Sequence, residues 1–167
     1  MAYKNLVNKE KAIKMLNDRG VKLTDIADIC YQIQKPYYDN LTLEDCLHNV
    51  ERVIEKTEVQ HVIFTGIALD VLCEKGLLPD PLDKLVSDDY SLYGVDEILA
   101  LGIVNVYGSI GFTNFGYVDK EKIGIIEKVD KIGKQSDKCM TFLDDIIGAI
   151  AAATASRIAH NRFENKE

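Results

Sequence analysis

The stretch TFLDDIIGAIAAATA, residues 141–155, decides the fold that the sequence predicts. Apart from its two aspartates it is apolar or small on every side of a helix, which is typical of a helix buried all round. Gly148 and Ala151 share one helical face, so other helices can approach closely there. We therefore predict a central C-terminal helix over about residues 136–162.

Apolar residues recur at helical spacing in most of the remaining chain. The predicted helices cover residues 6–20, 24–36, 42–56, 59–76 and 94–107. The last of these segments, GVDEILALGIVNVY, also fits a buried strand, and we expect the helix. Residues 79–89 are expected to form a surface turn with a short helix at most.

Two segments lack a clear helical pattern. GSIGFTNFGYVDK, residues 108–120, combines glycines and aromatic residues without an amphipathic period, so we expect an ordered loop, with a β-hairpin as the alternative. Residues 119–134 are highly charged and are expected to form a connector, either short helical or irregular. The predicted fold is all-α, a single domain over residues 1–167 with about six helices around the apolar C-terminal helix.

Composition narrows the functional classes. The 27 acidic and 20 basic residues give a net charge of -7, which disfavours binding to nucleic acid. The four cysteines form no C-x-x-C pair, so we expect reduced thiols rather than a zinc site. The charge-free stretch at residues 146–156 is well short of the roughly 20 residues that a membrane span needs. We expect a cytoplasmic protein.

Asp144 and Asp145 lie in the most apolar segment, where an unpaired buried charge costs several kcal/mol. One interpretation is a capping box, with Thr141 as the N-cap residue and Asp144 as its partner. That interpretation leaves Asp145 without a role. The other interpretation is a divalent metal site, because hard cations such as Mg²⁺ bind carboxylate oxygens.

A second pair of adjacent acids, Asp96 and Glu97, opens the other very apolar segment. On a helix Asp96 shares a face with Leu99 and Ile103, so we expect it to point inward. Acids in a first helical turn also complement the helix dipole, which explains either pair taken alone. The two pairs together favour a metal centre whose predicted ligands are Asp96, Glu97, Asp144 and Asp145.

Other polar groups fit simpler roles. The acids of a polar, proline-containing stretch are expected to be solvated: Asp80, Asp83, Asp88 and Asp89. The three histidines have no partner at ligand spacing. The lysines between residues 120 and 134 could attract a phosphate, although solvated surface charge is the simpler interpretation. The aromatic segment 107–117 could cover a site or pack its own aromatic rings.

The two acidic segments carry a resemblance to a known family. LDDIIGAIAAA resembles the D-D-x-x-[AG]-[GA] element that begins a C-terminal helix in the phosphatidylglycerophosphatase A family, and GVDEILALG resembles its D-E element. The order of apolar helices extends the similarity over about residues 55–160. The soluble, YutG-like branch of that family, a helical bundle around one central helix, is the most similar.

The resemblance implies a magnesium-dependent phosphatase that hydrolyses phosphatidylglycerophosphate or a related phosphomonoester. It places metal binding on Asp96, Glu97, Asp144 and Asp145, and catalysis on Asp144 and Asp145. Expected partners are a phosphorylated lipid head group or a small phosphomonoester, with peripheral membrane contact, no nucleic acid and self-association into a homo-oligomer. The alternative function is a non-catalytic, self-associating helical module with a regulatory or scaffold role.

Overall fold

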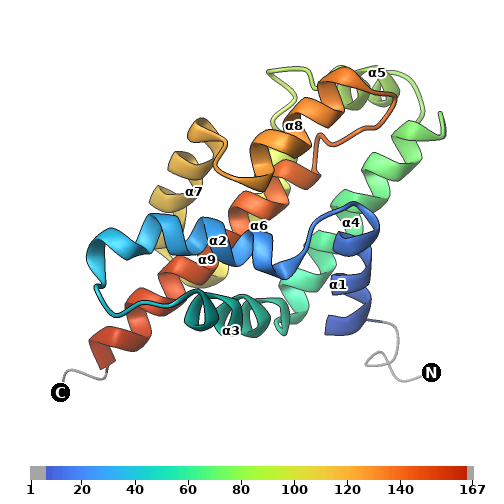
Figure 1. Ribbon diagram of the computed structural model, residues 1–167. Helices are drawn as coiled ribbons and strands as arrows, with labels where there is room; N and C mark the ends of the chain where they lie inside the picture. The colour runs from blue at the N-terminus through green and yellow to red at the C-terminus, as the bar shows by residue number, and fades with distance from the viewer. Residues whose placement is uncertain (1–6, 165–167) are drawn as a thin grey trace.

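The computed structural model describes the backbone of residues 7–164 and the side chains of residues 7–161. Within this part of the chain the structure is all-α, as predicted, with nine α-helices, two short 3-10 helices and no strand (Figure 1). The α-helices are α1 (Lys9–Asp18), α2 (Leu23–Gln34), α3 (Leu43–Ile54), α4 (Thr57–Glu74), α5 (Leu82–Ser87), α6 (Val95–Val104), α7 (Ser109–Glu121), α8 (Ile125–Gln135) and α9 (Leu143–Glu164). The 3-10 helices are η2 (Lys35–Tyr37) and η3 (Asn105–Tyr107).

The predicted central helix is confirmed as α9. Figure 1 shows α9 passing through the middle of the bundle, and α2, α3, α4, α6, α7 and α8 all contact it. Every residue from 139 to 156 is buried, so this segment lies in the one large hydrophobic core of the described chain. A helix surrounded on all sides cannot be amphipathic, which is why its sequence is apolar or small throughout.

Close approach between α4 and α9 depends on a glycine that faces the central helix. A Cβ atom added at Gly66 would lie 3.1 Å from Cβ of Phe142 and closer still to the side chain of Ile146. The backbone of α4 therefore rests directly on the first turns of α9. This contact brings α4 to the acidic end of the central helix.

Several local signals are confirmed. The predicted helix over residues 42–56 is α3, and Thr42 and Asp45 form a capping box at its start. The Asp45 amide donates to the Thr42 hydroxyl at 3.1 Å, and the Thr42 amide donates to the Asp45 carboxylate at 3.0 Å. The segment 94–107 is helical, as α6 followed by η3. Residues 79–89 contain only the short helix α5.

Two predictions about helix content are wrong. Residues 108–120 form most of α7 rather than a loop or hairpin, because Phe115 and Val118 pack against α9 and tertiary burial outweighs weak helix propensity. The connector is helical, which was one of its two predicted possibilities, and its helix α8 buries Ile126 and Val129. The central helix starts at Leu143 rather than near residue 136. The described chain therefore has nine α-helices instead of about six.

No helix in the described range is both long enough and apolar enough to cross a lipid bilayer.

Candidate metal centre

The two predicted acidic pairs lie in the first turns of two helices that pack together. Asp96 and Glu97 follow Gly94, which precedes α6 with a left-handed φ of 65° that favours glycine. Asp144 and Asp145 are in the first turn of α9, and α6 packs along α9. Carboxylate oxygens of Asp96, Glu97 and Asp145 all lie within 4.8 Å of one another. The structure thus brings three of the four predicted ligands together.

Burial and like charge make this three-acid cluster costly without a cation. Asp145 is 5% exposed and Asp96 is 7% exposed. Burial, followed by the negative charges of Asp144, Asp119 and Asp96, raises the pKa of Asp145 to about 9. Burial, followed by the neighbouring Glu97 carboxyl group, raises the pKa of Asp96 to about 7.

One oxygen in the cluster also lacks a hydrogen-bond partner. Oδ1 of Asp96 is buried and receives no hydrogen bond from any described residue. A buried, unpaired carboxylate oxygen beside two further carboxylates is a donor set that suits a hard divalent cation such as Mg²⁺. The residues present therefore fit the metal that the sequence predicts.

Asp144, the fourth predicted ligand, lies outside this cluster and contacts a lysine. Nζ of Lys122 donates to Oδ2 of Asp144 at 2.9 Å and to Oδ1 of Asp119 at 2.9 Å. Burial raises the pKa of Asp144 to about 6 even though Lys122 opposes the shift. Burial opposes protonation of Lys122, but the carboxylates of Asp144 and Asp119 raise its pKa overall. The two adjacent aspartates thus face different partners.

The start of α9 is set by Asp70, a fully buried residue of α4. The amide N–H of Phe142 donates to Oδ1 of Asp70 at 3.0 Å, and that of Leu143 donates to Oδ2 at 3.1 Å. Thr141 does not form the capping box considered from the sequence, because its hydroxyl donates to the Val86 carbonyl at 2.7 Å. A carboxylate from a distant helix therefore supplies the cap.

Asp70 was missed as a site-forming residue, although the sequence contains a signal. It is the single acid within the apolar run between residues 59 and 73. Arg19 supports the same region from α1, because Nη2 donates to the Cys139 carbonyl and to the Glu74 carboxylate, each at 2.6 Å. Burial raises the pKa of Asp70 to about 7, with opposition from the two amides and from Arg19.

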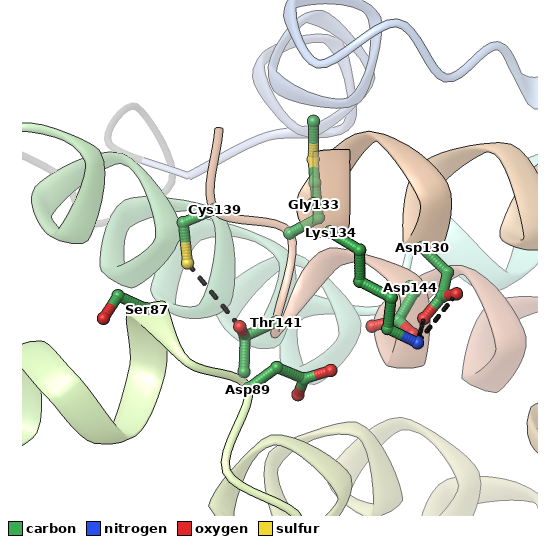
Figure 2. A pocket seen from close by; sticks show the side chains of 9 residues that line it. Ser87, Asp89, Asp130, Gly133, Lys134, Cys139, Thr141 and Asp144 are labelled. Atoms are coloured by element: carbon green, nitrogen blue, oxygen red, sulfur yellow. Dashed lines mark hydrogen bonds and ion pairs between the residues drawn. The ribbon is translucent and has the colours of Figure 1, made fainter. Parts of the chain in front are cut away.

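A cavity of about 150 Å³ lies beside Asp144, on the side next to α5 and α8 (Figure 2). Its polar lining residues are Ser87, Asp89, Asp130, Lys134, Thr141 and Asp144. Asp89 is exposed, as expected, yet it lines this cavity. Asp89 and Lys122 are the non-glycine residues of the described chain with positive φ, at 46° and 48°. Such backbone strain is frequent around functional sites.

Comparisons with known proteins identify similar sequences. Residues 20–160 match the family model described as phosphatidylglycerophosphatase A. The uncharacterized Bacillus subtilis protein YpjQ is 58% identical over 146 residues, covering 87% of this chain and 81% of its own. YutG of the same organism, also uncharacterized, is 53% identical over 150 residues, covering 90% and 89%.

A solved structure extends the comparison to three dimensions. The low temperature requirement C protein from Listeria monocytogenes is 54% identical and superposes with a TM-score of 0.90 over 93% of this chain and 96% of its own. The helical bundle is therefore a shared fold, and the acidic ends of α6 and α9 lie within the matched family region.

Proposed function

The chain belongs to the phosphatidylglycerophosphatase A family, and from this premise we propose that it is a magnesium-dependent phosphomonoester hydrolase. The family description suggests a phosphatidylglycerophosphatase-like activity. The observation that carries the proposal is the meeting of Asp96, Glu97 and Asp145 within 4.8 Å. The unpaired buried oxygen of Asp96 supports it, because a cation would satisfy that oxygen.

In this proposal Asp96, Glu97 and Asp145 hold the divalent cation. When bound, the cation supplies positive charge that offsets the negative charge of the phosphate group. A bound cation would also offset the negative charge of Asp96, which adds to burial and to the charges of Asp144 and Asp119 in raising the pKa of Asp145. In this proposal the phosphate group would lie where the first turns of α6 and α9 meet.

We assign proton transfer to Asp144 and a contact with the phosphate group to Lys122. Asp144 donates a proton to the oxygen of the departing alcohol, and Lys122 orients its carboxyl group through the 2.9 Å contact. An ammonium group has three N–H donors, and the contacts with Asp144 and Asp119 use two of them. The third is available to a phosphate oxygen. Water attack at phosphorus breaks the P–O bond to the alcohol, which leaves with the proton from Asp144. A proton of the attacking water restores Asp144, and inorganic phosphate is released.

The proposed substrate is a phosphorylated lipid head group or a small phosphomonoester. Peripheral contact with a membrane is supported by the exposed apolar side chains that flank the site along the chain, since Leu92 is 82% exposed and Ile98 is 67% exposed. Replacing both by serine is expected to lower activity on phosphatidylglycerophosphate in mixed micelles. Activity on a water-soluble substrate serves as the control measurement.

Phosphate release from phosphatidylglycerophosphate, with and without added Mg²⁺, tests the function. Wild type is expected to be active only with the cation, and Asp145→Asn is expected to lose activity by about 100-fold, the upper end of the range for a group that supports metal binding. Asp80→Asn is the matched control, because Asp80 is exposed and lies outside the cluster and the cavity lining. Equal activity in wild type and Asp145→Asn would remove the cluster from the mechanism.

A result without catalysis would favour the alternative function. If Mg²⁺ neither promotes phosphate release nor raises the thermal stability of the protein, the acidic pairs act as first-turn helix charges. The chain would then be a non-catalytic helical module, and its self-association would become the property to measure.

A further inference from the structure

The cavity beside Asp144 has a chemical character different from that of the acidic cluster. Figure 2 shows the side chain of Asp89 directed along one wall, toward the side on which Asp130, Lys134 and Asp144 lie. Thr141 and Ser87 add hydroxyl groups to the lining. The cavity is therefore lined mainly by groups that form hydrogen bonds.

The charges of the lining argue against a second phosphate. Asp89, Asp130 and Asp144 are acidic, and Lys134 is the cation of this lining. Nζ of Lys134 is already paired with Oδ1 of Asp130 at 2.8 Å. A phosphate dianion would be repelled by the remaining carboxylates, whereas neutral hydroxyl groups can donate hydrogen bonds to them. The lining fits an uncharged group that is rich in hydroxyls.

The size of the cavity points the same way. Ligand sites for drug-sized molecules usually have about 300 to 1,000 Å³, and this cavity has about 150 Å³. It therefore has room for a group of a few heavy atoms and not for an acyl chain. Its polar walls would also leave an acyl chain facing carboxylates, which is unfavourable.

The backbone is strained at two residues that lie near Asp144 in space, Lys122 and Asp89. Lys122 contacts Asp144 directly at 2.9 Å, and Asp89 lines the same cavity. Both residues have left-handed φ values, which cost a lysine more than an asparagine or aspartate. The fold thus places the Lys122 ammonium and the Asp89 carboxylate near Asp144 at some cost in backbone energy.

We propose that this cavity is the subsite for the alcohol part of the phosphomonoester, and that Asp89 selects alcohols that carry free hydroxyl groups near the phosphate. The inference rests on the proposed function. With the phosphate at the acidic cluster, the esterified alcohol extends past Asp144 into the cavity, where hydroxyls donate to Asp89. A glycerol phosphate group has this chemistry, whether it is free in solution or forms a lipid head group.

The test compares sn-glycerol 3-phosphate with ethyl phosphate, which has no free hydroxyl, in the presence of Mg²⁺. Wild type is expected to favour glycerol phosphate in kcat/KM by about tenfold or more. This is the effect expected from the free energy of hydrogen bonds between hydroxyls and a carboxylate. In Asp89→Gly, which relaxes the left-handed backbone and removes the carboxylate, that ratio is expected to fall toward one. Asp80→Asn should retain the wild-type ratio.

A binding measurement makes the test independent of turnover. Calorimetric titration with each phosphate should show tighter binding of glycerol phosphate to wild type and a loss of this preference in Asp89→Gly. Equal binding of the two phosphates to wild type, or an unchanged preference in Asp89→Gly, would overturn the subsite whether or not the protein is catalytic.

A third substrate distinguishes the two sources of the glycerol phosphate group. Phosphatidylglycerophosphate in detergent micelles is assayed beside sn-glycerol 3-phosphate. A loss of activity in Asp89→Gly on either substrate supports the subsite and identifies that substrate as the source. Unchanged activity of Asp89→Gly on both substrates overturns the subsite. Absence of Mg²⁺-dependent phosphate release from all substrates contradicts the proposed function instead, and the titrations then decide on the subsite.

Discussion

Replacing Asp70 by alanine should destabilise the protein strongly, because its carboxylate caps α9 from a fully buried position. The substitution leaves the N–H groups of Phe142 and Leu143 without an acceptor. Each buried, unsatisfied donor costs about 1 to 3 kcal/mol. Loss of an aspartate whose pKa burial has raised to about 7 offsets part of this cost. We expect a net loss of about 3 kcal/mol, combining those ranges.

Urea denaturation followed by far-ultraviolet circular dichroism measures this loss directly. The midpoint should fall with an unchanged m value, and the melting temperature should fall by about 6 to 12 °C for a chain of this size. Asp70→Asn keeps one acceptor and is expected to lose about half as much. A loss below about 1 kcal/mol in Asp70→Ala would refute the assignment of Asp70 as the cap of α9.

Three further predictions concern the cluster and its packing. In metal-free protein the folded-state pKa of Asp145, about 9, lies above its ordinary value of 3.8. Between these pH values the folded state binds more protons than the unfolded state. The free energy of unfolding should therefore fall as pH rises from about 4 to about 9. Urea titrations at several pH values should show a smaller fall in Asp145→Asn, and an equal fall would contradict this origin. Mg²⁺ at 100 times its Kd should stabilise wild type by about 2.7 kcal/mol and Asp145→Asn much less, as thermal melts would show. Gly66→Ala places a Cβ 3.1 Å from that of Phe142 and should destabilise the protein by about 1 to 3 kcal/mol. Gly116 has open space around it, so Gly116→Ala should stabilise the protein by about 0.5 to 1 kcal/mol in the same denaturation assay.

The sequence by itself was sufficient for features that depend on local pattern. The apolar circumference of residues 141–155 predicted the central helix, because a helix contacted on all sides needs apolar residues on all sides. The capping box of Thr42 and Asp45 was predictable because its partners are three positions apart. The two acidic pairs were recognisable because charge is rare in such apolar segments.

Only the tertiary structure decided how these parts meet. The helix α7 forms because Phe115 and Val118 are buried against α9, whereas the glycines in its sequence give it a weak helix propensity. The start of α9 depends on Asp70, which accepts a hydrogen bond from the amide of Phe142, 72 positions later in the sequence.

The two adjacent aspartates of α9 show the same limit at the candidate site. Asp145 joins Asp96 and Glu97, whereas Asp144 contacts Lys122 and the cavity that Asp89 lines. Neighbouring positions on a helix differ by about 100° in direction, so each side chain meets partners from different elements. Residue identity could mark these acids as unusual, but which partners they meet follows from the packing of helices distant in sequence.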